Sequence, residues 1–135
     1  MKKPVVIALV VIAFFVIVLN SSMVADQAVA WVKENPKDVD APTVLFRAAR
    51  WCDIMGDNKK ATEIYLQLYQ QYPQKSELCA PALYYVSNIL ANGSNIVALR
   101  QQAVPYLEII INQYSTQGDW ALKAKQLMDE VKYVH

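Results

Sequence analysis

The sequence predicts an all-α protein in which one apolar N-terminal helix precedes a short array of helical hairpins. Uninterrupted apolar residues run from Val5 to Leu19. In the rest of the chain, apolar residues recur every three to four positions between turns marked by glycine and proline. No alternating pattern of apolar and polar residues is long enough to predict a strand instead. With 135 residues, 55% of them hydrophobic and 19% charged, the chain has room for one small domain and an accessory segment.

The N-terminal apolar run has two interpretations, a membrane anchor and a cleaved signal peptide. A helix from Pro4 to Ala25 would be about 33 Å long, which is enough to cross a bilayer core of about 30 Å. The cleavage pattern is poor, because the small-residue motif Ala28-Val29-Ala30 lies beyond Asp26 and far from the apolar run. The sequence therefore favours an anchor within residues 1–25, with a signal peptide as the alternative.

Charge around this run predicts its orientation. Lys2 and Lys3 precede it and Asp26 is the first charge after it, so the N-terminus is expected inside and the remainder outside. We therefore expect a single-pass membrane protein whose residues 26–135 form a helical domain in the periplasm or another extracytoplasmic space. The net charge of +1 gives no reason to expect nucleic acid as a partner.

Five further stretches have the periodicity of amphipathic helices. The first begins after Asp40, a candidate N-cap, carries Pro42 in its first turn and ends near Met55. The other four extend approximately over residues 61–72, 80–92, 103–114 and 119–131. Because the connections are short, successive helices are expected to be antiparallel neighbours.

An internal similarity links two parts of this array. Asn35-Pro36, followed by residues 41–46, resembles Tyr72-Pro73, followed by residues 80–85, roughly 38 residues further along. Two similar helical units at such a period indicate a solenoid.

Residues 42–75 resemble the tetratricopeptide-repeat family. The resemblance rests on a large residue followed by a small pair, a Gly-Asp turn that leads into an alanine, an aromatic residue four positions later and a closing proline: Leu45, Ala48, Ala49, Gly56, Asp57, Ala61, Tyr65, Leu68 and Pro73. A following unit, with Leu83, Ala103 and Leu107, matches more weakly because the turn from Asn92 to Gln102 is longer than the family pattern.

This resemblance extends weakly over the rest of the chain after the anchor. Residues 24–35 are similar to the second half of a preceding repeat, and residues 119–131 are similar to a final solvating helix. The style is similar to that of membrane-attached periplasmic repeat proteins of envelope assembly. The resemblance implies a short helical-hairpin solenoid that binds other proteins.

Catalytic and metal-binding patterns are missing from the sequence. His135 is the only histidine, no glycine-rich phosphate loop is present, and the adjacent carboxylates Asp129 and Glu130 would point in different directions on a helix. We therefore expect no enzyme, cofactor or metal. Cys52 and Cys79 are expected to be unpaired, because the repeat would hold them about 10 Å apart along its axis, beyond the reach of a disulfide.

Aromatic residues are numerous, and most are expected to fill the core, including Tyr65, Tyr72 and Tyr114. The resemblance implies that the first helix of each repeat lines a concave surface, where tyrosine, tryptophan and arginine are typical binding anchors. That surface would present Phe46, Arg50, Asp53, Tyr84 and Asn88.

The predicted function is a scaffold for protein-protein interaction. We expect a small structural or assembly subunit of a larger complex, with copies of itself among the candidate partners. The alternative is an adaptor or chaperone-like factor in envelope assembly that binds client peptides in the concave groove.

Overall fold

The computed structural model describes residues 2–19, 21–93 and 97–133, which contain helices and no strand. The all-helical part of the prediction therefore agrees with the structure. The elements are α1 (Lys3–Leu19), α2 (Ser21–Glu34), α3 (Ala41–Ile54), α4 (Asn58–Gln71), α5 (Ser76–Asn92), α6 (Val97–Arg100), the 3-10 helix η1 (Gln101–Ala103), α7 (Val104–Gln113) and α8 (Gly118–Tyr133).

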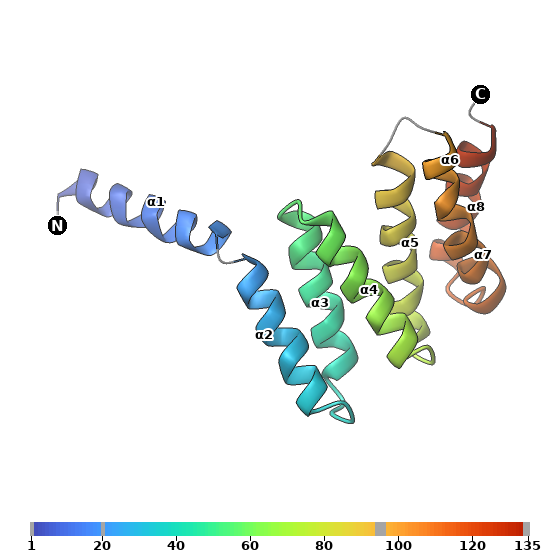
Figure 1. The fold of residues 1–135 in the computed structure, drawn as a ribbon, viewed down its shortest axis with the longest axis horizontal. Coiled ribbons are helices and arrows are strands. Elements are labelled where there is room, and N and C mark those ends of the chain that lie inside the picture. Colours follow the sequence, from blue (N-terminus) through green and yellow to red (C-terminus); the bar gives the residue numbers. More distant parts are fainter. Residues whose placement is uncertain (1, 20, 94–96, 134–135) are drawn as a thin grey trace.

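The N-terminal apolar run does not form the predicted transmembrane helix. It makes up α1, whose 17 residues correspond to about 25 Å, and Figure 1 shows α1 and α2 pointing in different directions. Among the described residues, no helix is both long and apolar enough to cross a membrane. The predictions of a transmembrane helix and of single-pass placement with the domain outside are therefore wrong.

The start of α2 explains this correction, because it packs into the helical array. Ala25 is fully buried. Lys60 of α4 forms an ion pair with Asp26 and donates a hydrogen bond to the carbonyl oxygen of Ser22 at 3.3 Å. Residues that the sequence assigned to the end of a membrane span thus belong to the first helix of the array.

From α2 onward, the long helices form a stack in which consecutive helices run in opposite directions (Figure 1). α3 lies between α2 and α4, and α5 contacts α4, α7 and α8. The core lies between these helices, and its large, fully buried side chains include Leu45, Tyr65, Leu68, Leu83, Leu107 and Ile110.

The turn between α3 and α4 is fixed by a C-terminal glycine and a capping aspartate. Gly56 has a positive φ of 83°, which a residue without a side chain adopts at low cost. The backbone N–H of Asp57 donates to the carbonyl of Cys52, and the N–H of Gly56 donates to that of Asp53, which is a Schellman motif. Asp57 then caps α4 by accepting from the N–H of Lys60.

The third predicted helix begins earlier than expected. α5 starts at Ser76, not near Ala80, and Pro81 lies inside it. Because Pro81 is the sixth residue of α5, the helix lacks the backbone bond that an N–H at this position would donate to the carbonyl of Glu77. The long connection after α5 contains α6 and η1, and Arg100 anchors it by donating from Nε to the carbonyl of Ala91 at 2.7 Å.

Two equivalent tyrosine bonds link successive layers of the stack. Tyr72, after α4, donates from its hydroxyl to the carbonyl of Pro36 at 2.6 Å, and Tyr114, after α7, donates to that of Pro73 at 2.7 Å. Tyr72 follows α4 and reaches Pro36, which follows α2. In the same way, Tyr114 follows α7 and reaches Pro73, which follows α4. α2, α4 and α7 therefore hold equivalent positions. Tyr65 and Tyr114 are buried as predicted, whereas Tyr72 is only partly buried and packs against the core.

Candidate functional site

Side chains from α3, α5 and α8 meet in one aromatic surface. We define the aromatic surface as Phe46 of α3, Tyr84 and Tyr85 of α5, and Trp120 of α8, all of them partly buried and packed against the core. The surface forms because α5 contacts both α3 and α8. Residues distant in sequence are thereby placed on one continuous face.

Tyr85 is the centre of this surface. Its ring centroid lies 6.3 Å from that of Phe46, 6.2 Å from that of Tyr84 and 5.7 Å from that of Trp120. The rings are inclined to one another, and such pairs contribute about 0.5–1.5 kcal/mol each beyond the area that they bury. The buried ring of Tyr65 stacks on Tyr85 at 5.7 Å. Contacts on several sides therefore hold Tyr85 in place.

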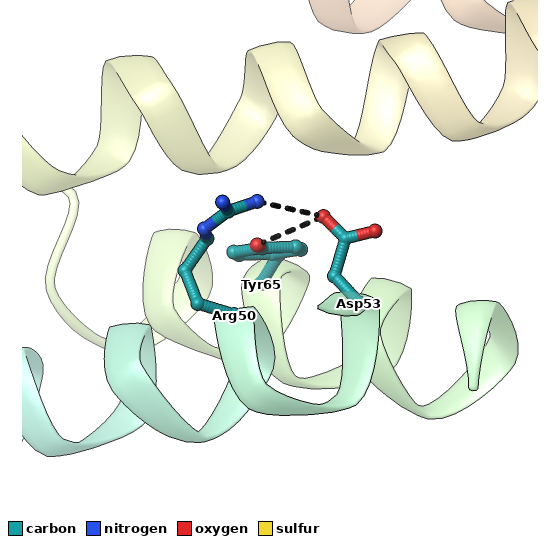
Figure 2. A network of polar contacts seen from close by, with 3 residues as sticks. All are labelled: Arg50, Asp53 and Tyr65. Carbon is teal, nitrogen blue, oxygen red and sulfur yellow. Dashed lines mark hydrogen bonds and ion pairs between the residues drawn. The ribbon is translucent and has the colours of Figure 1, made fainter. Parts of the chain in front are cut away.

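A polar network holds Arg50 beside these rings. Figure 2 shows Arg50 and Tyr65 reaching the same carboxylate oxygen of Asp53: Nη1 of Arg50 lies 3.1 Å from Oδ2, and the hydroxyl of Tyr65 donates to it at 3.3 Å. Burial raises the pKa of Tyr65, so its hydroxyl keeps its proton and remains a donor. The guanidinium carbon of Arg50 lies 4.3 Å from the centroid of Tyr85, within cation-π range.

A second cation lies beside Trp120 of the aromatic surface. Nζ of Lys123 lies 4.4 Å from the ring centroid of Trp120. Asn88 is exposed on α5, one turn after Tyr84, and its side-chain oxygen accepts a hydrogen bond from Asn92 at 2.6 Å. A polar amide thus lies on α5 one turn beyond Tyr84.

The structure brings four of the five predicted partner-binding residues into direct contact with this site. Phe46 and Tyr84 are part of the aromatic surface, and Arg50 and Asp53 form the adjoining ion pair. Asn88 lies on the same helix as Tyr84, beyond the contacting rings.

Sequence reasoning missed Tyr85 and Trp120 as members of the site. The internal similarity contained a signal for Tyr85, because it aligns Phe46 with Tyr85 and not with Tyr84. Trp120 had no comparable signal, because it belongs to the last helix, where the repeat pattern is weakest.

The two cysteines lie outside this site. Both are free and buried, and the thiol of Cys79 donates to the carbonyl of Tyr72 at 3.2 Å. Burial raises the pKa of Cys79 to about 11, so the thiol is protonated at neutral pH and is a poor nucleophile. In the described part of the chain, no group of three or more histidine, cysteine, aspartate or glutamate residues could hold a metal ion.

A second surface feature lies at the open edge of the stack, between α2 and α3. It is an apolar groove of about 250 Å³, lined by Val24, Ala28, Val44, Arg47, Ala48 and Trp51. The indole N–H of Trp51 is buried and has no hydrogen-bond acceptor within the described residues. Such a donor is unusual in a folded protein.

Among the surface features of the described residues, the aromatic surface has the side chains that are typical of a binding site. It joins tyrosine, tryptophan and arginine, the residue types that dominate protein-protein hot spots, and its side chains are already fixed by mutual contacts. Comparison of the chain with protein-family models, with curated proteins and with solved structures found no match.

Proposed function

We propose that this chain is a tetratricopeptide-like scaffold that binds a protein partner on its aromatic surface. The observation that carries the proposal is the meeting of Phe46, Tyr84, Tyr85 and Trp120 on one face while each keeps part of its surface open to solvent. Large aromatic side chains that remain partly open supply most of the binding energy when a partner covers them.

Preorganisation of the site supports this proposal. Arg50 is held by Asp53 and by the ring of Tyr85, and Tyr85 is held by the rings around it. Ordering a free, rotamer-rich side chain on binding costs about 0.5–1.5 kcal/mol. Because these side chains are ordered before the partner arrives, less of that cost is incurred.

The tetratricopeptide-like character is supported by the sequence pattern of residues 42–75 and by the equivalent tyrosine bonds. Tyr72 to Pro36 and Tyr114 to Pro73 relate α2, α4 and α7 to one another. α3 and α5 are then the first helices of the pairs α3–α4 and α5–α7, and α8 follows the last pair. These three helices carry the aromatic surface.

The triple variant Phe46→Ala, Arg50→Ala and Tyr84→Ala is expected to stay folded and to lose its partner. These side chains are partly open, so their removal should disturb the core less than removal of a fully buried residue. The measurement is a pull-down with the full chain as bait, combined with circular dichroism of each variant.

The matched control for this triple variant is Glu63→Ala, Gln70→Ala and Leu122→Ala, because all three residues are exposed and none belongs to the aromatic surface. The control should keep every protein that the unmodified chain retains. A folded aromatic-surface variant that also keeps every partner would show that binding lies elsewhere.

A second candidate function is a structural subunit joined to its complex through the groove between α2 and α3. It is favoured by the unpartnered indole N–H of Trp51 and by the apolar lining of the groove. Val24 is 53% exposed, so Val24→Glu should fold normally. In the same pull-down, loss of the partner from Val24→Glu together with its retention by the triple alanine variant would favour this candidate.

A further inference from the structure

We propose that the groove between α2 and α3 holds helix α1 of a second copy of this chain, and that two copies exchange these helices reciprocally. The inference goes beyond the proposed function, because it concerns a surface other than the aromatic surface. It names the occupant of the groove on which the second candidate function depends. It is argued from the open face of α2, the exposed side chains of α1 and the short connection between these two helices.

α2 is the counterpart of α4, but it lacks one of the two neighbours that α4 has. Each helix contains 14 residues, and their first residues, Ser21 and Asn58, lie 37 positions apart. Pro36 and Pro73, which accept the equivalent tyrosine bonds, lie the same distance apart. α4 lies between α3 and α5, whereas α2 is the first helix of the described stack and has only α3 beside it in the stack (Figure 1).

The face of α2 that is left open carries apolar side chains at packing positions. At the offset of 37 residues, three of the four buried residues of α4 have apolar counterparts in α2. Ala61, Tyr65 and Leu68 of α4 correspond to Val24, Ala28 and Trp31 of α2. The three residues of α4 are fully buried, whereas Val24 is 53% and Trp31 is 38% exposed. Val24 and Ala28 line the groove, so the groove lies where the array would pack one more helix.

α1 has the apolar surface and the length to fill this position. Ten large side chains between Val5 and Val16 are 44–63% exposed. With on the order of 100 Å² open on each, they expose about 1,000 Å², whereas the largest apolar patch of a typical monomer is about 300–600 Å². A stable interface buries about 800 Å² on each partner. The 17 residues of α1 are also enough to cover the 14 residues of α2.

The connection between α1 and α2 is too short for α1 to fill the groove of its own chain. One residue lies between the end of α1 at Leu19 and the start of α2 at Ser21. Antiparallel helices are joined by loops of about 2–5 residues. Accordingly, α1 leaves the array at the start of α2 (Figure 1). The same helix of a second copy has no such restraint, and exchange in both directions gives a closed twofold dimer.

The alternating direction of the helices predicts how the incoming α1 is oriented. Because consecutive helices of the stack run in opposite directions, a helix placed before α2 should run antiparallel to it. The last turn of the incoming α1 then lies beside the first turn of α2. Val16, the fourth residue from the end of α1, should therefore lie near Val24, the fourth residue of α2.

The first test measures the mass of the full chain by size-exclusion chromatography with light scattering. The unmodified chain is expected at twice its mass of 15.3 kDa. Val24→Glu should run at the mass of one chain, because the incoming helix would bury a carboxylate without a partner. Leu122→Glu is the matched control, since Leu122 is exposed on α8, and it should stay dimeric. Circular dichroism checks that both variants are folded.

The second test traps the contact as a disulfide between two copies. A tagged chain with Val16→Cys is mixed with an untagged chain with Val24→Cys and oxidised, and a mixed dimer is expected on a non-reducing gel. Because the two new cysteines are on different chains, a bond between them can form only between copies. Val16→Cys mixed with Leu122→Cys should give no mixed dimer. Cys52 and Cys79 are buried, so they should not compete.

Three results would overturn the inference: the mass of one chain for the unmodified protein, a dimer of folded Val24→Glu, or equal trapping of Leu122→Cys and Val24→Cys. A monomeric chain that holds a different protein or a lipid at Val24 would show that the groove has another occupant.

Failure of the proposed function is distinguishable from failure of this inference. The triple variant Phe46→Ala, Arg50→Ala and Tyr84→Ala should remain dimeric, because its side chains lie outside the groove. If that variant is monomeric while Val24→Glu remains dimeric, the copies meet at the aromatic surface and the exchange of α1 is wrong.

Discussion

Leu83→Ala is expected to lower the free energy of unfolding by about 2–5 kcal/mol, because it creates a cavity at the centre of the stack. Leu83 is fully buried in α5, the helix that contacts α3, α4, α7 and α8. The side chains around Leu83 come from several helices that pack against α5, so few of them can move to fill the cavity. Urea denaturation followed by circular dichroism at 222 nm measures the effect.

Leu122→Ala is the matched control for this prediction. It removes the same atoms from a leucine of α8 that is 57% exposed, so its effect should stay within about 0.5 kcal/mol. Equal denaturation midpoints for the two variants would contradict the position of α5 in the core.

Ala61→Leu is expected to lower the free energy of unfolding by about 1–3 kcal/mol, through overpacking. Ala61 is fully buried in the first turn of α4, and α3 and α4 are in extensive contact. A leucine at this position must displace the opposite helix or adopt an unfavourable rotamer. Thermal denaturation detects the change as a lower midpoint.

Lys59→Ala, two residues earlier in the chain, tests whether the loss at Ala61 depends on burial. Lys59 is exposed, and alanine is a good helix former, so little change is expected. A Lys59→Ala variant as unstable as Ala61→Leu would rule out close packing of α3 against α4 at this point.

Helix ends were predictable where glycine or proline restricts the backbone conformation locally. Gly56 occupies a positive φ and ends α3, and Pro73 follows the end of α4. Such residues act locally, so their effect can be read from the sequence without knowledge of the tertiary fold.

Two boundaries were predicted incorrectly because they depend on tertiary contacts. The sequence treated Ser21 and Ser22 as a continuation of the apolar run, whereas α2 begins at Ser21 and is tied to α4 through Lys60. It also placed the start of α5 near Ala80, whereas the helix begins at Ser76. Neither the link to Lys60 nor the extra turn before Ala80 has a signature in apolar periodicity.

The candidate site was only partly predictable, because some of its contacts also depend on the tertiary fold. Periodicity and the family resemblance selected Phe46, Arg50 and Tyr84, which do lie at the site. They did not select Tyr85 as its centre, because adjacent helix residues differ by about 100° in direction and a small error in register exchanges their faces. The contact of Tyr85 with Trp120 depends on where α8 packs, which only the fold determines.

Site-specific photo-crosslinking tests most directly whether the surface of α3, α5 and α8 is where the partner binds. A benzophenone amino acid is placed at Asn88, exposed one turn after Tyr84, and separately at Gln70, exposed on α4. With the protein retained by the unmodified full chain, illumination should give a covalent adduct from Asn88 and none from Gln70. An adduct from Gln70 alone, or from neither position while the partner stays bound, would contradict binding at the aromatic surface.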